Sequence, residues 1–592
     1  MKSNLKIVSF ILAFMMLVPF TACTNGTSSE EPSQEVVDNA VDLNSLSDYE
    51  FATRMVSSVD ALGRITLAGG GEEAKDVGLF YFLWLGAHAS GSKIYNVSEL
   101  EKNNPNALWS HSSPDSPAGV YHFWGEPLYG YYDSADPWVI TRHVELFTMI
   151  GVDYILFDTT NAITYDNVVK TMLPILDKYQ KQGWDVPQIG FMTNTHSRDT
   201  VLNIYNTYYK KSTSTCYYPD LWYSPNGKPF IIGNKVEFNR NNATDKEMLD
   251  FFQLRDAQWP NAGYIDKDAF PWMDWSYPQT NHNGTVSVSI AQHITCKMSL
   301  KDQNWGRSYD QYSAQNFGDY EWGTNFQDQW YTVLYPEDDY GDVDNVFVTG
   351  WNEWIAIKFY DDANGVYFVD QFDEDYSRDI EMMKGGYGDN FYLQLFNNIR
   401  EFKYESPVRY AMDKVGGNSE IDWQKVRSYP DFVGDAMNRN FKNYLGNATL
   451  TDTTARNDIS SVKITYDDKN VYFRIETAKA ITDYKAGDKS FMNVWISTSK
   501  SGEGFDYVIN RDYARLSKIS GGQYTDAGSL DVNVSGNVMT IRLPMSSINQ
   551  SGTPAFRFKV SDNVDASDVM NFYIQGDSAP IGRLTYTYGY MA

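Results

Sequence analysis

The chain has 592 residues, which exceeds what one hydrophobic core supports and predicts two or more domains. Its 76 acidic side chains outnumber the 49 basic ones, which gives a formal net charge of −27. A surface this negative repels nucleic acids and polyanions, and it agrees with an uncharged ligand. The sequence has no phosphate-binding loop, HExxH or CxxC motif, so we expect neither a cofactor nor a metal.

Residues 1–22 have the features of an export signal. Two lysines precede an apolar run that is too short to span a bilayer. The tetrapeptide FTAC (20–23) resembles a lipobox, although Phe is unusual at its first position. That resemblance implies cleavage before Cys23 and a lipid on its thiol, whereas a plain secretory signal is the alternative. We expect an outer-membrane lipoprotein of a Gram-negative bacterium, at the cell surface or on the periplasmic face, with residues 23–50 as a flexible acidic tether.

Between residues 51 and 405, apolar strand-like runs alternate with amphipathic helical runs. Strands are expected at 77–86, 152–161, 188–196, 228–235, 271–278, 287–293 and 345–354, and helices at 136–151, 166–183 and 245–259. The first of these helices has Asp136 as its N-cap, Pro137 in its first turn and Gly151 at its end. This alternation indicates a parallel sheet, and we predict a (β/α)8 barrel in which one strand is not placed.

Residues 406–592 have a different pattern, in which short alternating strands are separated by turns. The sequence DDKN (467–470) predicts one hairpin turn, and the region as a whole predicts an all-β sandwich. All seven histidines precede residue 300, and 14 of the 16 tryptophans precede residue 405. We therefore expect the chemistry to lie in the first domain.

Glu353 is the first-ranked candidate for a catalytic group. In a (β/α)8 barrel the active site lies at the C-terminal ends of the strands, and Glu353 follows a buried apolar run there. It lies between two tryptophans, where the pKa of a carboxyl group rises. Asp158, which ends another strand, and Glu126, in a long aromatic loop, are candidates for a second carboxyl group. Asp158 is alternatively a turn cap, and Glu126 a wall residue.

Aromatic, amide and imidazole side chains at the same strand ends predict a sugar site. Pyranose rings stack on indoles, and their hydroxyl groups need amide and carboxylate partners. For His122 and His196, the alternative is a packed or surface position. The candidates for substrate binding are Trp84, His122, Trp124, Asn194, His196, Asp274, Trp275, His293, Trp351, Asn352 and Trp354.

Two stretches of the first domain resemble a known group of enzymes. The segments GYYDSADPWVITRHVELFTMIGVDYILFDTTN (130–161) and VFVTGWNEW (346–354) resemble glycoside hydrolase families 99 and 71 and the related WbsX-like barrels. The resemblance covers roughly residues 75–405 and implies a barrel that acts on glycosidic bonds, with Glu353 matching the Glu of the Asn-Glu-Trp motif. The endo-mannosidase pattern has a second Glu three positions later, where this chain has Ala356. The α-mannoside substrate therefore does not transfer.

The C-terminal domain resembles family 9-like carbohydrate-binding modules and their DOMON-type relatives, on ITYDDKNVYFRIE (464–476) and NVWIST (493–498). Together these resemblances imply a membrane-anchored glycoside hydrolase that uses two carboxyl groups on a neutral glycan. The alternative is a non-catalytic surface glycan-binding lipoprotein, which Ala356 favours. The expected partners are a glycan, the membrane through Cys23, and other glycan-uptake proteins at the cell surface, with no nucleic acid.

Overall fold

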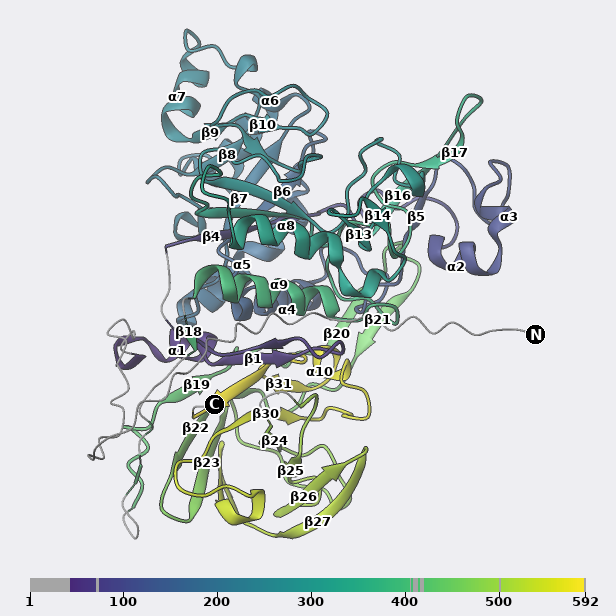
Figure 1. Ribbon diagram of the computed structural model, residues 1–592. Coiled ribbons are helices and arrows are strands. Elements are labelled where there is room, and N and C mark those ends of the chain that lie inside the picture. The colour runs from purple at the N-terminus through teal and green to yellow at the C-terminus, as the bar shows by residue number, and fades with distance from the viewer. Residues whose placement is uncertain are drawn as a thin grey trace, which may run out of the picture. The chain divides into compact units, whose positions relative to one another are not determined.

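The computed structural model describes residues 43–70, 74–404, 406–407, 412, 414–415, 420–499 and 502–589 (Figure 1). The expected signal peptide, the lipidated Cys23 and most of the expected tether lie outside these residues. Within the described part of the chain, no helix is long and apolar enough to cross a membrane.

The first domain contains a seven-stranded parallel sheet. Its strands lie in the order β12 (Thr285–Ser289), β15 (Asn345–Thr349), β4 (Asp76–Tyr81), β6 (Tyr154–Thr159), β7 (Gln188–Thr193), β8 (Phe230–Ile232) and β9 (Gln253–Arg255). All six neighbouring pairs are parallel, so the carboxyl ends of the strands lie along one edge. Most strand residues are buried on both faces, as covered parallel sheets require. This mixed α/β architecture with a parallel half-barrel sheet agrees with the expected fold class at that level.

The helices between the strands begin and end where local chemistry places them. They are α4 (Pro137–Ile150), α5 (Asp166–Gln182), α6 (Ser197–Ile204), α7 (Ala243–Phe251), α8 (Thr324–Leu334) and α9 (Asn390–Lys403). In α4, the Asp136 side chain accepts a hydrogen bond from Trp138 N, Pro137 occupies the first turn, and Gly151 ends the helix with φ 82°. The predicted bounds of this helix are confirmed.

Three predicted elements differ from the structure. The predicted helix 245–259 ends at Phe251, and the chain continues as β9 and β10 (Ala257–Gln258), which supply the strand that the sequence left unplaced. The predicted strand 271–278 is reduced to β11 (Phe270–Pro271), which pairs with β10. The segment MNFYIQG (570–576), which the pattern of short C-terminal strands also predicts as a strand, contains instead the short helix α10 (Asn571–Ile574). The apolar residues within 253–258 are spaced so that they also fit one face of a helix, which explains the first error.

The C-terminal domain is built from two antiparallel sheets. One has the order β19 (Ser428–Pro430), β22 (Ile459–Tyr466), β23 (Asn470–Thr477), β29 (Val538–Pro544) and β28 (Asp531–Ser535). The other contains β32 (Thr585–Tyr588), β30 (Phe556–Asp562), β24 (Asn493–Ser497), β25 (Tyr507–Ile509), β26 (Arg515–Ser520) and β27 (Gln523–Ser529), with β31 (Asp577–Ala579) paired to β30. Phe473 of the first sheet lies 6.1 Å from Phe556 of the second, ring to ring, so the sheets pack face to face. The predicted hairpin at 467–470 joins β22 and β23.

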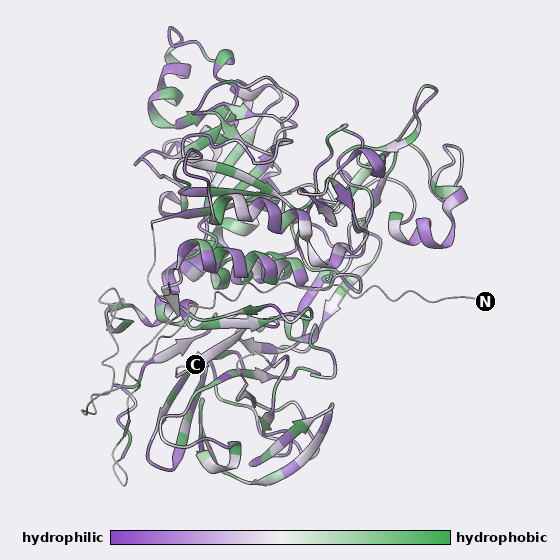
Figure 2. Cartoon of the chain, in the orientation of Figure 1, coloured by the Kyte–Doolittle hydropathy of each residue, from purple (hydrophilic) through white to green (hydrophobic). Residues whose placement is uncertain are grey.

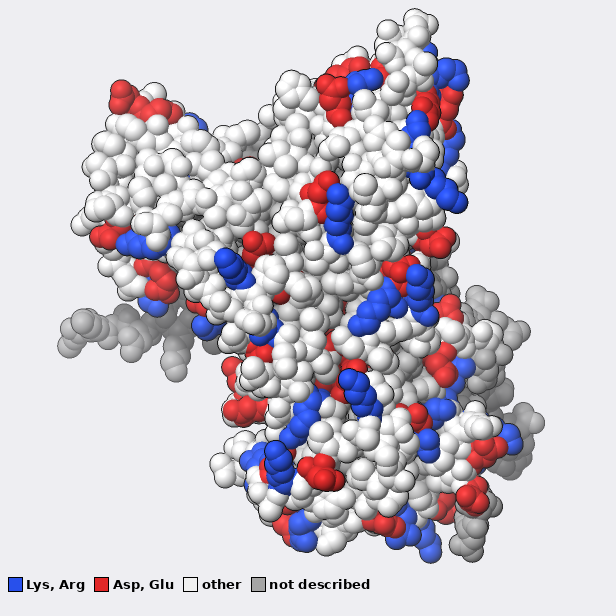
Figure 3. All heavy atoms as spheres, turned by 180° about the vertical axis from the view of Figure 1, so that it is seen from behind, with Lys and Arg blue, Asp and Glu red and all other residues white. Residues whose placement is uncertain are grey.

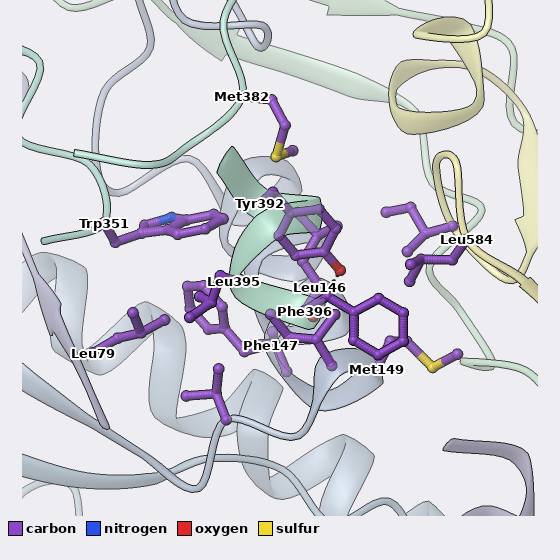
Figure 4. Packing of buried hydrophobic residues seen from close by; sticks show 14 of the residues in the cluster. Leu79, Leu146, Phe147, Met149, Trp351, Met382, Tyr392, Leu395, Phe396 and Leu584 are labelled. Atoms are coloured by element: carbon purple, nitrogen blue, oxygen red, sulfur yellow. Dashed lines mark hydrogen bonds between the residues drawn. The ribbon is translucent and has the colours of Figure 1, made fainter. Parts of the chain in front are cut away.

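The N-terminal strand β1 (Val56–Val59) belongs to the second of these sheets, since Val56 pairs with Tyr586 and Ser57 with Thr585 of β32. Hydrophobic residues gather on the inner strands and on the helices against them (Figure 2). One buried cluster contains Phe147 of α4, Phe396 of α9 and Leu584 before β32, which Figure 4 shows together. The segment 51–59, assigned from the sequence to the barrel, thus connects both halves of the chain.

Candidate active site

Glu353 lies four residues beyond the end of β15, at the carboxyl edge of the parallel sheet. Gly350 directly follows β15, and a Cβ atom there would lie only 2.8 Å from Asp379 Oδ1. The same carboxylate oxygen accepts a hydrogen bond from Glu353 N at 2.8 Å. Trp124 Nε1 donates to the Glu353 carbonyl oxygen at 3.0 Å. The backbone of Glu353 is thereby fixed on both sides.

The two carboxyl oxygens of Glu353 have different surroundings. Oε2 is paired with the buried guanidinium of Arg378 and lies 3.4 Å from Gln371 Nε2. Oε1 accepts no hydrogen bond from any described residue and is not among the buried atoms without a partner. The residue keeps 8% of its surface exposed. We infer that Oε1 is the oxygen that meets solvent.

Besides Asp379, two further carboxylates lie within electrostatic reach of Glu353. Asp158, the fifth residue of β6, is buried, and its Oδ1 accepts hydrogen bonds from Thr160 N at 3.0 Å and Thr160 Oγ1 at 2.8 Å. Asp370 has a side chain that is 46% exposed, and it lies 3.9 Å from Arg378. The positive charge of Arg378 interacts with the carboxylates of Glu353, Asp158 and Asp370. Asp158 is in β6 and Glu353 follows β15. Only β4 lies between these two strands in the sheet.

Burial raises the pKa of Glu353 well above its usual range, and the charge of Arg378 opposes that rise. The charges of Asp370, Asp379 and Asp158 raise it further. Burial also raises the pKa of Asp158 to about 6, against the hydrogen bonds from Thr160. The expected rise in the pKa of Glu353 is confirmed, and desolvation is its main cause.

A buried hydrogen-bond network holds Asn352 and Trp354, the two neighbours of Glu353. Glu381 accepts from Trp354 Nε1, from Tyr132 OH at 2.7 Å and from His143 Nε2 at 2.7 Å. Asn352 uses its amide on the backbone of Phe82, accepting from N at 2.9 Å and donating to O at 3.2 Å. Because this network is fully enclosed, it fixes the direction in which the chain presents Glu353.

Aromatic rings lie near the three carboxylates. Trp84 is half-buried and stacks on Tyr165 with the ring centroids 6.0 Å apart, and burial and then the charge of Asp158 raise the pKa of Tyr165. The pKa of half-buried Tyr121 is raised by burial and by the charges of Glu353 and Asp370. Trp272 lies under Arg378, with 5.1 Å from the guanidinium carbon to the ring centroid. Of these rings, the half-buried Trp84 and Tyr121 offer apolar faces on which a sugar could stack, whereas Tyr165 and Trp272 are buried.

His293 and Trp275 belong to the same neighbourhood. Their rings lie 6.0 Å apart, and His293 lies 6.0 Å from Trp272. Burial lowers the pKa of His293 to about 4, and the Arg378 charge contributes. Its Nδ1 has no hydrogen-bond partner among the described residues. Because this nitrogen is itself buried, contact between His293 and a substrate hydroxyl group stays a prediction.

The remaining candidates are not exposed side chains beside Glu353. Each is paired elsewhere, buried, or exposed at another place. Glu126 forms a surface ion pair with Lys384 at 2.9 Å. Asp274 caps its own turn by accepting from Ser276 N at 2.8 Å and Thr280 N at 2.7 Å. The other members of this group are His122, which is buried and bonded to Ser116, the exposed Asn194 and His196, and the fully buried Trp124, Trp351, Asn352 and Trp354.

The burial of the indoles gives them a packing role in this conformation. Trp351 is enclosed by Phe147, with 4.6 Å between the rings, and by Tyr392 (Figure 4). Trp124 and Trp354 stack on each other at 4.1 Å and 15°. Their roles as substrate contacts stay predictions, and this geometry favours them less than it favours the half-buried Trp84 and Trp275.

Sequence reasoning missed the aromatic residues Tyr121, Tyr165 and Trp272, and the polar residues that it missed come from one segment, 369–381. This segment supplies Asp370, Gln371, Arg378, Asp379 and Glu381, each of which acts on Glu353 or on its neighbours. The density of acidic residues in FVDQFDEDYSRDIE was visible, but nothing local indicated that the segment folds back onto β15.

Comparison with known proteins gives similarities to solved structures only. No protein-family model matches the chain, and no curated protein matches it. Two structures of a GH99 endo-α-mannosidase from Bacteroides thetaiotaomicron align over 56% of this chain and 98% of theirs, at 14% and 15% identity and TM-scores of 0.30 and 0.31. A family 9 carbohydrate-binding module from Caldicellulosiruptor kristjanssonii, in complex with glucose, aligns over 30% of this chain and 83% of its own, at 12% identity and a TM-score of 0.14.

Proposed function

We propose that the protein is a glycoside hydrolase that cleaves a neutral glycan with Glu353 and Asp158 as its pair of carboxyl groups. The observation that carries the proposal is that Glu353 and Asp158 both lie at the carboxyl edge of one parallel sheet, where burial and then the charges of Asp370, Asp379 and Asp158 raise the pKa of Glu353. Glycosidic cleavage needs one carboxyl group that donates a proton and a second that acts as nucleophile or base. The first-ranked residue thus has a partner, although Ala356 lies where the resembling enzymes have theirs.

In the proposed mechanism, Glu353 is the proton donor. Its Oε2 accepts from Arg378 and faces Gln371, so the proton resides on Oε1, the oxygen that meets solvent. Asp158, with a pKa of about 6, is ionised at neutral pH and serves as nucleophile or base. Asp370, at the open side, contacts substrate hydroxyl groups and shares the Arg378 charge.

The proposal includes a closed (β/α)8 barrel as the scaffold. The pair β10–β11 continues from β9, and β11 contacts β12, which is the far edge of the seven-stranded sheet. This arrangement supports closure through β11. In such a barrel Asp158 and Glu353 share one mouth.

The test is a screen of the purified protein against plant, fungal and host glycans, followed by Glu353→Gln. Gln preserves shape and accepts from Arg378 but cannot donate a proton, so turnover should fall at least ~10²-fold. Asp158→Asn should cause similar damage, and the two losses should not multiply in the double variant, since both residues act in one step. Melting temperature is the folding control. A Glu353→Gln variant within a few-fold of wild type would remove the residue from the mechanism.

A second candidate function is glycan binding without cleavage. The observation that favours it is Ala356, whose methyl side chain occupies β16 (Ile355–Asp361) opposite His122 of β5 (Tyr121–Phe123). A binding protein would retain its affinity for the glycan and show no products with it. Binding that is unchanged in Glu353→Gln, with no turnover by wild type on any bound glycan, would decide for this function.

We also propose that Cys23 carries a lipid and holds the protein at the outer membrane. The apolar run before FTAC and the polar segment after it support this. A fatty-acid analogue fed to the producing cell should label the wild type, and Cys23→Ala should lose the label. Equal labelling of both would contradict the anchor.

A further inference from the structure

Five carboxylates gather inside the protein, away from Glu353. Asp435, Asp458 and Asp577 each place one carboxylate oxygen within 4.8 Å of those of the other two. Asp431 and Glu145 complete the group, since the charges of Asp577, Asp435 and Glu145 all raise the pKa of Asp431 after burial itself. On the face shown in Figure 3, by contrast, acidic and basic side chains are interspersed.

A second observation points to a ligand in this cluster. Asp577 is only 1% exposed; its Oδ2 accepts from Ile459 N at 2.5 Å, whereas its Oδ1 has no hydrogen-bond partner among the described residues. Asp431 Oδ2 and Glu145 Oε1 are buried without a partner in the same way. A buried carboxylate oxygen without a donor or cation costs several kcal/mol in general, so three in one place call for a missing positive charge.

The protein's own cations do not balance the group. Arg142 Nη1 lies 3.2 Å from Asp435 and 3.4 Å from Glu145. Lys559 donates to the carbonyl of Pro580, and burial lowers its pKa to about 7. Lys178 donates to the carbonyl of Gly434 at 3.1 Å. Among the described cations, only Arg142 forms ion pairs with the group, because Lys559 and Lys178 are bonded to carbonyl oxygens, and Asp577 Oδ1, Asp431 Oδ2 and Glu145 Oε1 stay without a partner.

We propose that Asp435, Asp458 and Asp577 bind a divalent cation of the hard, oxygen-preferring class, with Ca²⁺ as the best fit. Ca²⁺ takes carboxylate oxygens at about 2.3–2.6 Å, so two oxygens on one ion are at most about 5 Å apart, which the three Asp oxygens satisfy. The ligands come from three segments: the loop after β19, the residue before β22, and the start of β31. The ion would fasten these segments together beside α4, to which Arg142 belongs. No motif marked the site, because its ligands are far apart in the sequence.

The experiment measures metal binding and stability in the full chain. After dialysis against EDTA and then buffer, Ca²⁺ titration by calorimetry should show about one tight site, and the melting temperature should rise with Ca²⁺. Asp577→Asn should weaken Ca²⁺ binding at least ~10-fold. In EDTA this variant should be at least as stable as wild type, since one of the mutually repelling charges is gone.

Asp562→Asn is the matched control. Asp562 is also a buried aspartate of the sandwich, but both of its oxygens are bonded to Arg456, at 2.6 Å and 2.9 Å. This variant should lose stability in EDTA and keep the wild-type affinity for Ca²⁺. Absence of any response of wild type to millimolar Ca²⁺ or Mg²⁺ would overturn the proposal. So would a Ca²⁺ response that Asp577→Asn leaves unchanged, because the ion would then lie elsewhere.

Discussion

The two carboxyl oxygens of Glu353 differ in their contacts. Oε2 is bonded within the protein, and Oε1 is the oxygen that meets solvent. Arg378 and Gln371 face Oε2, and the Glu353 backbone is bound by Asp379 and Trp124. This asymmetry fixes both the orientation of the group and the position of its proton. Asp158 has no ion-pair partner among the described residues, and its oxygen Oδ1 accepts hydrogen bonds from Thr160. The two carboxyl groups therefore differ in environment, as an acid and its partner must.

The pH dependence of kcat/KM should follow from these environments. Activity should rise with pH through about 6 as Asp158 ionises, and it should fall at higher pH as Glu353, whose pKa is raised, loses its proton. Arg378 lowers the pKa of both groups, so Arg378→Gln should move the whole profile to higher pH. Rate measurements over pH 4–10 check this, roughly the range in which carboxyl groups with raised pKa values titrate. A profile that keeps its position in Arg378→Gln would contradict the assignment.

At the scale of elements, the turn between β15 and Glu353 depends on Gly350. In Gly350→Ala, the new methyl group would meet Asp379 Oδ1 at 2.8 Å and displace the carboxylate that holds Glu353 N. Overpacking of this kind costs about 1–3 kcal/mol of folding stability, and we expect turnover to fall as well. Denaturant unfolding and the rate on the identified glycan measure the two effects.

Gly263→Ala is the control for that variant. Gly263 is exposed, and a Cβ atom there would have nothing within 4 Å. Its substitution should stay within about 0.5 kcal/mol of wild type. Equal stability and turnover of the two alanine variants would show that the contact between Gly350 and Asp379 is not tight in solution.

Local chemistry made part of this architecture predictable. Asp136 and Pro137 define the start of α4 and Gly151 its end, each through local chemistry, and the position of Glu353 followed from the apolar run before it. The segment 369–381 was not predictable in the same way, because its contacts with Glu353 are set by tertiary folding. Likewise, the sequence shows that Trp351 and Trp354 flank Glu353 but not that both indoles turn into the core.

At the scale of the whole molecule, buried ion pairs join elements of the two domains. Arg439 of β20 (Arg439–Lys442) pairs with Asp136, the N-cap of α4, at 2.8 Å, and it donates to the carbonyl of Tyr129 at 2.7 Å. Arg583 pairs with Asp389, before α9, at 2.9 Å. Together with the pairing of β1 and β32, these contacts make the C-terminal domain part of the support for α4 and α9. The first domain, which holds Glu353, and the C-terminal domain are therefore more closely connected in the structure than the sequence pattern indicated.

This coupling predicts a large cost for Arg439→Met. The variant would leave the fully buried carboxylate of Asp136 without its cation, which costs roughly 3–5 kcal/mol for buried pairs. The matched control is Arg515→Met, whose partner is Asp526 on the hairpin β26–β27, with side chains 41% and 57% exposed. Exposed pairs contribute about 0–1 kcal/mol, so the control should unfold close to wild type. Denaturant unfolding of both variants measures the difference. If Arg439→Met loses no more stability than Arg515→Met, α4 does not depend on the C-terminal domain. If it loses the expected amount, a chain that ends at residue 405 should also fail to keep α4, and with it the network behind Glu353, in place.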